Sequence, residues 1–197
     1  MELKLDSNNF IYNSAKNGGA LYLSNKKDSS VSEKRAINIL NNIFKYNIAD
    51  NFGGAIYSEY DQMYLAVINN NTISYNEAGI TGGGLYTPSA VDKNLFDPKL
   101  IDIGNNTVNS YNNDYSTKPS YIVLDIILNQ KVVDIITGEY LPLKFILYDE
   151  YDNIMEDITK YYSSISLKVK NNNISNNKDI KIKLLGNVCS FVNGKRK

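Results

Sequence analysis

The chain repeats one motif, and this repeat constrains its fold more than any other feature of the sequence. Each copy begins with two Asn residues, reaches an apolar residue followed three positions later by another Asn, and then has a pair of Gly residues after a spacer. These residues are Phe10, Asn13, Gly18 and Gly19; Phe44, Asn47, Gly53 and Gly54; and Ile73, Asn76, Gly82 and Gly83. We interpret Asn105-Asn106-Thr107-Val108 as a decayed fourth copy without the Gly pair, which spaces the lead apolar residues by 34, 29 and 35 positions.

The repeat predicts stacked β-structure. Its apolar segments are short, they lack a helical period, and the Asn, Gly and Ser residues between them favour turns. A short β-segment that recurs in this way buries its apolar face only by stacking on the next copy, at ~4.8 Å per strand. We therefore expect two inward columns, Phe10, Phe44 and Ile73 in one and Leu21, Ile56 and Leu85 in the other.

Three other positions of the repeat carry predictions. The Gly pairs are expected at tight corners, because Gly tolerates positive φ and close backbone approach. The Asn that ends each FxxN unit is expected to stack as a ladder whose amides satisfy one another and the bent backbone. The tyrosines that precede these Asn residues have two interpretations: packing within the stack, or an exposed binding stripe, since Tyr gives amphipathic contact area at low entropic cost. They are Tyr12, Tyr46 and Tyr75.

The linked motifs resemble a known family. Phe10-Ile11-Tyr12-Asn13 with Gly18-Gly19-Ala20-Leu21-Tyr22, and the second copy likewise, are similar to the FxxN and GGA[ILV]Y repeats of chlamydial polymorphic outer-membrane proteins. They also resemble the adhesin-like surface proteins of methanogenic archaea. The third copy departs from the pattern with Ile73 for Phe and Gly84 for Ala. The resemblance covers about residues 1–115. It implies a right-handed parallel β-helix, an adhesive or surface role, and no catalytic residue.

The second half of the chain has a different pattern. The polar stretch 112–119 ends in Pro and reads as a linker, so we assign residues 1–115 to the β-helix and 116–197 to a second domain. The runs 121–128, 143–148, 164–170 and 179–184 are strand-like, and clean alternation in the last two predicts an antiparallel sheet. We expect a small immunoglobulin-like β-sandwich, too short to be complete. The stretch 147–153 resembles a corner of immunoglobulin-like surface repeats, with Asp152 where Gly is usual.

Composition excludes several classes of function. Lys and Arg balance Asp and Glu at 21 each, which argues against a nucleic-acid partner and a polybasic membrane surface. The absence of His excludes His-based catalysis and metal binding, and we expect Cys189 to be a buried small residue. No apolar run reaches the ~18 residues of a membrane span, and the start does not resemble a signal peptide. We expect part of a longer extracellular or cell-surface protein, with no cofactor or metal.

Three functions remain open at this stage. The favoured one is a non-catalytic adhesin-like or stalk module that binds surface glycans or proteins of a host or neighbouring cell. The others are a pure spacer and a remnant of a β-helical polysaccharide lyase or hydrolase of pectin-lyase-like fold, although the acids in the repeat form no paired motif. An acidic cluster offers a Ca²⁺ site or, as we favour, a solvated loop: Asp149, Glu150, Asp152, Glu156 and Asp157. Exposed terminal repeats also predict marginal stability and end-to-end stacking.

Overall fold

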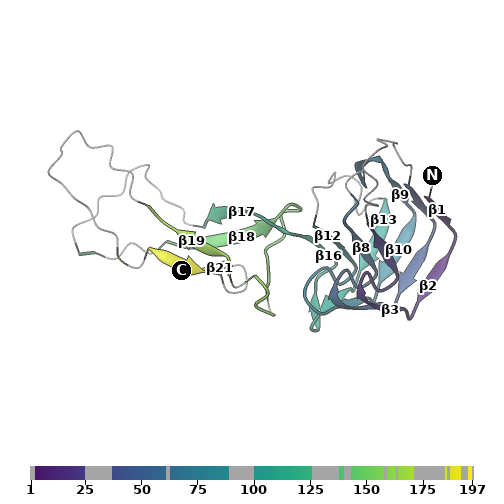
Figure 1. Cartoon of the computed structure of the whole chain (residues 1–197), viewed down its shortest axis with the longest axis horizontal. Helices are drawn as coiled ribbons and strands as arrows, with labels where there is room; N and C mark the ends of the chain where they lie inside the picture. Colours follow the sequence, from purple (N-terminus) through teal and green to yellow (C-terminus); the bar gives the residue numbers. More distant parts are fainter. Residues whose placement is uncertain are drawn as a thin grey trace. The chain divides into compact units, whose positions relative to one another are not determined.

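A computed structural model describes residues 3–24, 37–60, 63–88, 100–125, 138–139, 143–157, 159–162, 164–170, 185, 187–191 and 195–196. Apart from one 3-10 turn, η1 (Met63–Leu65), the regular structure of this part is all β, and most strands pair in parallel (Figure 1). The chain divides into two compact units. The coiled unit contains Met1–Tyr121 and Asp149–Asn153, and the C-terminal unit contains Ile122–Tyr148 and Ile154–Lys197. No described helix is long and apolar enough to cross a membrane.

The coiled unit passes repeatedly through the same four sheets, and we call each pass a coil. Coil 1 contains β1 (Leu3–Asp6), β2 (Asn9–Ile11), β3 (Ser14–Asn17) and β4 (Leu21–Leu23). Coil 2 contains β5 (Ile37–Leu40), β6 (Ile43–Lys45), β7 (Ile48–Phe52) and β8 (Ile56–Ser58). Coil 3 contains β9 (Val67–Asn69), β10 (Asn71–Ser74), β11 (Glu77–Ala78) and β12 (Leu85–Thr87). Coil 4 contains β13 (Ile101–Gly104), β14 (Thr107–Val108), β15 (Tyr111–Asn112) and β16 (Tyr115–Thr117).

Strands from successive coils lie side by side in each sheet. The sheet orders are β1-β5-β9, β13-β10-β6-β2, β15-β14-β11-β7-β3 and β16-β12-β8-β4. All of these neighbours are parallel except the hairpin pair β14 and β15. Figure 1 shows the stack as strands coloured from purple to teal. Coils 1 to 3 therefore each add one strand to every sheet, whereas coil 4 adds strands only to the last three sheets.

Apolar columns fill the space between these sheets. Phe10 pairs with Phe44 and Phe44 with Ile73, and the two Phe rings stack with their centroids 4.7 Å apart. The second predicted column is present as well, because Leu21 pairs with Ile56 and Ile56 with Leu85. Most of these side chains are buried. Each fully buried one contributes about 1.5–3 kcal/mol through removal of apolar surface from water.

The fourth copy lies in a different register from the one we predicted. Ile73 pairs with Ile103, whereas Val108 pairs with Ala78. Ile103 therefore continues the Phe10 column, and the identification of Val108 as the lead apolar residue of the fourth copy was wrong. The error arose because Asn105-Asn106 resembles the Asn pair that starts each copy, while the true start, Ile101-Asp102-Ile103-Gly104, contains neither Asn nor Phe.

The strands beyond coil 4 are fewer and mainly antiparallel. The sheet β17-β18-β21 contains β17 (Pro119–Leu124), β18 (Phe145–Asp149) and β21 (Lys195–Arg196), while β19 (Ser166–Lys168) pairs with β20 (Val188–Ser190). The pairs β18–β21 and β19–β20 are antiparallel. This agrees with the prediction for the alternating run 164–170, which contains β19. Leu147, Met155 and Phe191 form a small core. Cys189 is only partly buried, and the predicted strand 179–184 lies outside the described residues.

The acidic corner that resembles immunoglobulin-like repeats belongs mostly to the coiled unit. Residues Asp149–Asn153 are assigned to the coiled unit, whereas Leu147 and Tyr148 of the same corner are assigned to the C-terminal unit. The Asp149 carboxylate is buried and accepts hydrogen bonds from the backbone N–H groups of Thr117, Tyr151 and Asn153 at 3.0, 2.8 and 2.9 Å. The interpretation of the cluster as a solvated loop was therefore wrong for Asp149, because its oxygens are engaged by the protein backbone.

Candidate functional site: a tyrosine row outside an asparagine ladder

The predicted Asn ladder runs along the inside of one corner of the coils. The Nδ2 group of Asn13 donates to Oδ1 of Asn47, Asn47 donates to Asn76, and Asn76 donates to Asn106, at 2.9, 2.9 and 2.8 Å. The backbone N–H of each donor residue reaches the same Oδ1 atom. The Nδ2 group of Asn47 also donates to the Phe10 carbonyl at 2.9 Å. The buried amides are therefore satisfied by the coils on both sides.

A second ladder, which we did not predict, occupies the preceding corner. Asn8 donates to Oδ1 of Asn42 and Asn42 to Oδ1 of Asn71, at 3.1 and 3.0 Å through Nδ2. Asn42 and Asn71 are buried. The Asn pair at the start of each copy was the signal. The coil 1 rung is the first Asn of its pair, whereas coils 2 and 3 use the second.

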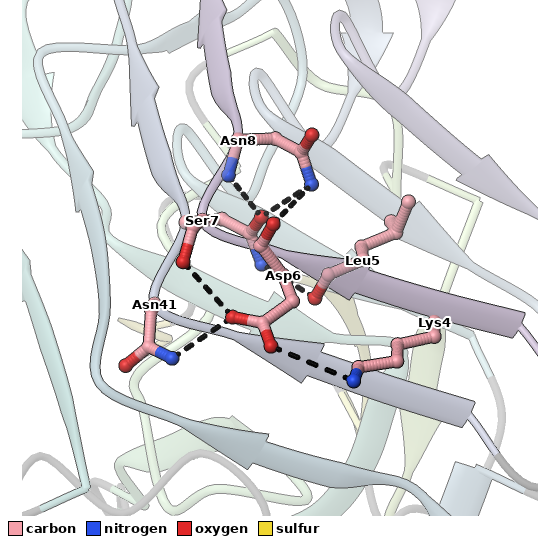
Figure 2. A network of polar contacts seen from close by, with 7 residues as sticks. Lys4, Leu5, Asp6, Ser7, Asn8 and Asn41 are labelled. Atoms are coloured by element: carbon pink, nitrogen blue, oxygen red, sulfur yellow. Dashed lines mark hydrogen bonds and ion pairs between the residues drawn. The ribbon is translucent and has the colours of Figure 1, made fainter.

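The outer side of this preceding corner is polar. Ser7, Asn41 and Asn70 share a left-handed backbone with φ of 60°, 57° and 52°. The Asp6 carboxylate accepts hydrogen bonds from Asn41 and Ser7, both at 3.0 Å, and the Lys4 ammonium lies 3.8 Å from it (Figure 2). The Asn41 hydrogen bond is the main reason why the pKa of Asp6 is lowered. Short polar side chains tolerate a left-handed backbone well, so Ser and Asn are ordinary residues at this corner.

The corresponding corner beside the first ladder carries tyrosines. Tyr12, Tyr46 and Tyr75 have φ of 58°, 56° and 58°, and 77%, 43% and 52% of their surfaces are exposed. Their rings stack along the coils, with centroids 5.1 Å apart between Tyr12 and Tyr46 and 5.5 Å apart between Tyr46 and Tyr75. The three residues that the sequence singled out therefore form one continuous surface feature, which we call the tyrosine row.

The backbone of the tyrosine row is unfavourable for its residue type. A non-Gly residue in the left-handed region costs about 1–3 kcal/mol, and the cost is greatest for bulky side chains. Coil 4 has Asn105 at this corner, with φ of 60°, and Asn is among the residues that tolerate it. The corner itself therefore does not require Tyr. Stacking offsets part of the strain, by about 0.5–1.5 kcal/mol per pair.

A second aromatic row lies near the Gly corner and differs in its environment. The Tyr22 and Tyr57 rings stack at 5.0 Å, and Tyr57 and Tyr86 at 5.7 Å. The Glu59 carboxylate accepts from the Tyr22 hydroxyl at 2.7 Å and the Tyr57 hydroxyl at 3.4 Å. The Tyr22 pKa is raised chiefly by its hydrogen bond to Glu59, whereas burial and the Glu59 charge raise the Tyr57 pKa to about 12. This row was not predicted, although Tyr ends each Gly-Gly motif in the sequence.

The two glycines of each pair have separate roles, as coil 2 illustrates. Gly53 has a left-handed φ of 64° and turns the chain. Gly54 lies under the next coil, where an added Cβ would overlap the carbonyl oxygen of Gly83. The pairs at Gly18-Gly19 and Gly82-Gly83 repeat this division. The predicted glycine corners are therefore structural and keep the coils at strand spacing.

The acidic residues do not assemble a metal centre in the described part of the chain. No group of three or more His, Cys, Asp or Glu residues there could hold an ion. Asp157, which is buried, accepts from the backbone N–H groups of Tyr161 and Tyr162 at 2.8 and 2.7 Å. Like Asp149, it therefore organises a turn and is not part of a solvated loop. Three of the scattered acidic residues of the repeat region, Asp61, Asp92 and Asp97, lie outside the described residues.

No family model, curated protein or solved structure matches this chain. A functional interpretation therefore rests on the geometry of its own residues. In that geometry the tyrosine row stands out because it combines exposure, regular spacing and an unfavourable backbone.

Proposed function

We propose that this chain is a non-catalytic, adhesin-like module of the cell surface, in which the coiled unit is a right-handed parallel β-helix that presents the tyrosine row to a surface glycan. The observation that carries the proposal is the row itself. Three tyrosines occupy left-handed positions that Asn fills at lower cost in coil 4, and their side chains remain exposed. Strain of this kind points to a function for the displayed side chains.

The fold part of the proposal has separate support. Four sheets of mainly parallel strands, to each of which coils 1 to 3 contribute one strand, are what a chain that winds around one axis produces. Right-handed connections are strongly preferred between parallel strands. The resemblance of the repeat to adhesin-like surface proteins agrees with this architecture and supplies the cell-surface setting. For the C-terminal unit we propose an immunoglobulin-like sandwich, supported by its antiparallel pairs.

The stacking of the row defines the surface that a ligand meets. Because the rings cover one another's faces, the accessible parts are the outer face of Tyr12, the ring edges and the phenol hydroxyls. The neighbours along the strands include Ile11 and Ile48, both exposed, with one cation, Lys45, and one anion, Glu77. Apolar edges with hydroxyls and balanced charge suit an uncharged glycan, whose rings offer C–H groups and hydroxyls. Binding should therefore depend little on salt.

A binding screen with matched variants tests this proposal. The intact chain is applied to immobilised glycans and to host proteins, and reducing-sugar release is assayed in the same wells. The test variant replaces all three row residues, Tyr12→Asn, Tyr46→Asn and Tyr75→Asn, because Asn retains the left-handed corner. The control is Tyr111→Asn, which removes an exposed Tyr in coil 4 outside the row.

The expected result is glycan binding without sugar release, at least about tenfold weaker in the triple variant and unchanged in the control. Binding that persists in the triple variant contradicts the role of the row. Sugar release favours the polysaccharide lyase or hydrolase alternative. Binding to a protein but to no glycan would contradict a glycan as the ligand. Absence of binding and of sugar release in every well favours a pure spacer, a function that the continuous Asn ladders also suit.

A further inference from the structure

The two Asn ladders have a direction, which makes the two ends of the coiled unit chemically different. In every rung the amide N–H groups of one coil donate to the Oδ1 atom of the next coil toward the C-terminus. A stack of this kind needs an acceptor at its last rung. At its first rung it presents Oδ1 atoms that still lack the donors of a preceding coil.

The ladder that starts at Asn13 has such an acceptor beside its last rung, Asn106. Asn106 donates its backbone N–H and its Nδ2 group to Oδ1 of Asp114, both at 2.9 Å. A carboxylate accepts hydrogen bonds and donates none, so Asp114 ends the ladder. Gly83 donates to the Asn113 carbonyl as Gly54 donates to that of Gly82, so Asn113 stands where coil 3 has the first Gly of the pair. Gly84 donates to the Asp114 carbonyl as Ala55 donates to that of Gly84, so Asp114 stands at the position after the pair. The corner that lacks the Gly pair in the fourth copy therefore carries the terminal cap.

The edge of the last coil is covered as well in two of its sheets, at β14 and β16. The hairpin strand β15 folds back antiparallel on β14. Along β16, the Thr117 N–H group donates to Asp149 and the Tyr115 carbonyl accepts from Asn153 at 3.1 Å. The Tyr151 ring packs edge-on against Tyr115, with centroids 5.3 Å apart. Backbone groups of β14 and β16 that would pair with another coil are thus already engaged, whereas β9 and β13 are the last described strands of their sheets.

The first coil has no corresponding cap among the described residues. Strands β1, β2, β3 and β4 are each the last strand of their sheets. Asn8 and Asn13 accept no hydrogen bond through Oδ1 from the described part of the chain, unlike the rungs of coils 2 and 3. Phe10, Leu3 and Leu5 remain only partly buried. The coils contact one another at three interfaces in the unit. The exposed side of coil 1 is therefore equivalent to the surfaces by which coils 2, 3 and 4 each contact the coil before them.

We propose that the outer face of coil 1 is a docking surface for one further coil of the same repeat type, with strands parallel to β1–β4 and Asn residues that donate to Asn8 and Asn13. A second copy of this chain fits less well. Its far end presents Asp114 and the Asp149–Asn153 corner, and its near end would bring acceptors against acceptors. This proposal replaces the end-to-end stacking of copies expected from the sequence with the docking of one further coil at one end, and it does not depend on the tyrosine row.

The test adds such a coil in a tethered form. A duplicate of residues 37–65 is joined ahead of Leu3, so that its end follows the connection between coils 2 and 3. The matched control carries Asn42→Asp and Asn47→Asp within the added copy only. Because an Asp side chain donates no hydrogen bond, the control retains the backbone and apolar contacts but places carboxylates against the Asn8 and Asn13 oxygens.

With Asn in the added copy we expect one cooperative urea transition, a higher midpoint, a larger m-value and about tenfold slower proteolysis of the added segment. The Asp control should leave the midpoint of the parent chain unchanged. A labile added segment in both proteins overturns the docking surface, and equal stabilisation by both overturns the role of the Asn donors. The parent chain should sediment as a monomer, so concentration-dependent association overturns the exclusion of a second copy.

Discussion

Tyr46 and Asn47 are neighbours in the sequence, yet they face opposite sides of the same corner. Asn47 is buried and exchanges hydrogen bonds with the coils before and after it. Tyr46 is 43% exposed and contacts its neighbours in the row mainly through ring stacking. The inner position is required by the fold, because any change leaves buried polar groups without partners. The fold does not require Tyr at the outer position. Within one motif, the Asn is therefore explained by structure, whereas the Tyr is available for a function.

The largest expected effect concerns the inner side of the stack. Gly54→Ala should prevent the coils from closing, because the new Cβ would overlap the Gly83 carbonyl oxygen. Gly104→Ala is the matched outer control, since a Cβ there meets nothing within 4 Å. We expect circular dichroism and urea unfolding to show loss of the folded coiled unit in the first variant only. A folded Gly54→Ala protein of normal stability would contradict the spacing argument.

The next largest effect is expected at the ladder. Asn47→Ala removes the acceptor of the Asn13 amide and the donor to Phe10 and Asn76, inside a buried corner. Unsatisfied buried groups cost about 1–3 kcal/mol each, so we expect a loss of about 3 kcal/mol or more in the free energy of unfolding. Urea denaturation measures it. A loss below about 1 kcal/mol would mean that water or relaxation replaces the rung.

A smaller effect on stability is expected at Tyr46, the residue before Asn47. Tyr46→Asn relieves about 1 kcal/mol of backbone strain but removes two ring contacts of similar total value, so the free energy of unfolding should change by less than about 1 kcal/mol. The same denaturation experiment compares it directly with Asn47→Ala. If Tyr46→Asn destabilises the protein as strongly as Asn47→Ala does, the row is part of the packing and the functional proposal loses its basis.

The smallest effect is expected in alkaline solution. The Tyr57 pKa is raised from 10.0 to about 12 in the folded chain, so the proton is held more tightly there than in the unfolded chain. The resulting stability is fully present below pH 10 and is lost progressively as the pH rises toward 12. Urea midpoints between pH 9 and pH 12 should therefore decline, and Tyr57→Phe should flatten the decline. An identical decline in that variant would assign it to other groups.

Much of the coiled unit could be predicted because its contacts repeat with the sequence. Phe10, Phe44 and Ile73 occur at equivalent places, so their column followed from the motif alone. The fourth copy could not be placed in this way. Once Phe and Gly are replaced, only the pairing of Ile73 with Ile103 shows which residue continues the column.

The parallel stacking, the glycine corners, the Asn13 ladder and the tyrosines of the row all followed from the repeated motif. The folded chain was needed to show which side of the corner each residue faces, that Asp114 ends the ladder, and that Asp149 returns from beyond coil 4 to cover the β16 edge. A repeat encodes contacts between equivalent positions, and these can be read from the motif. The direction of a side chain depends on the local φ, and a cap depends on a single, non-repeated contact between distant residues.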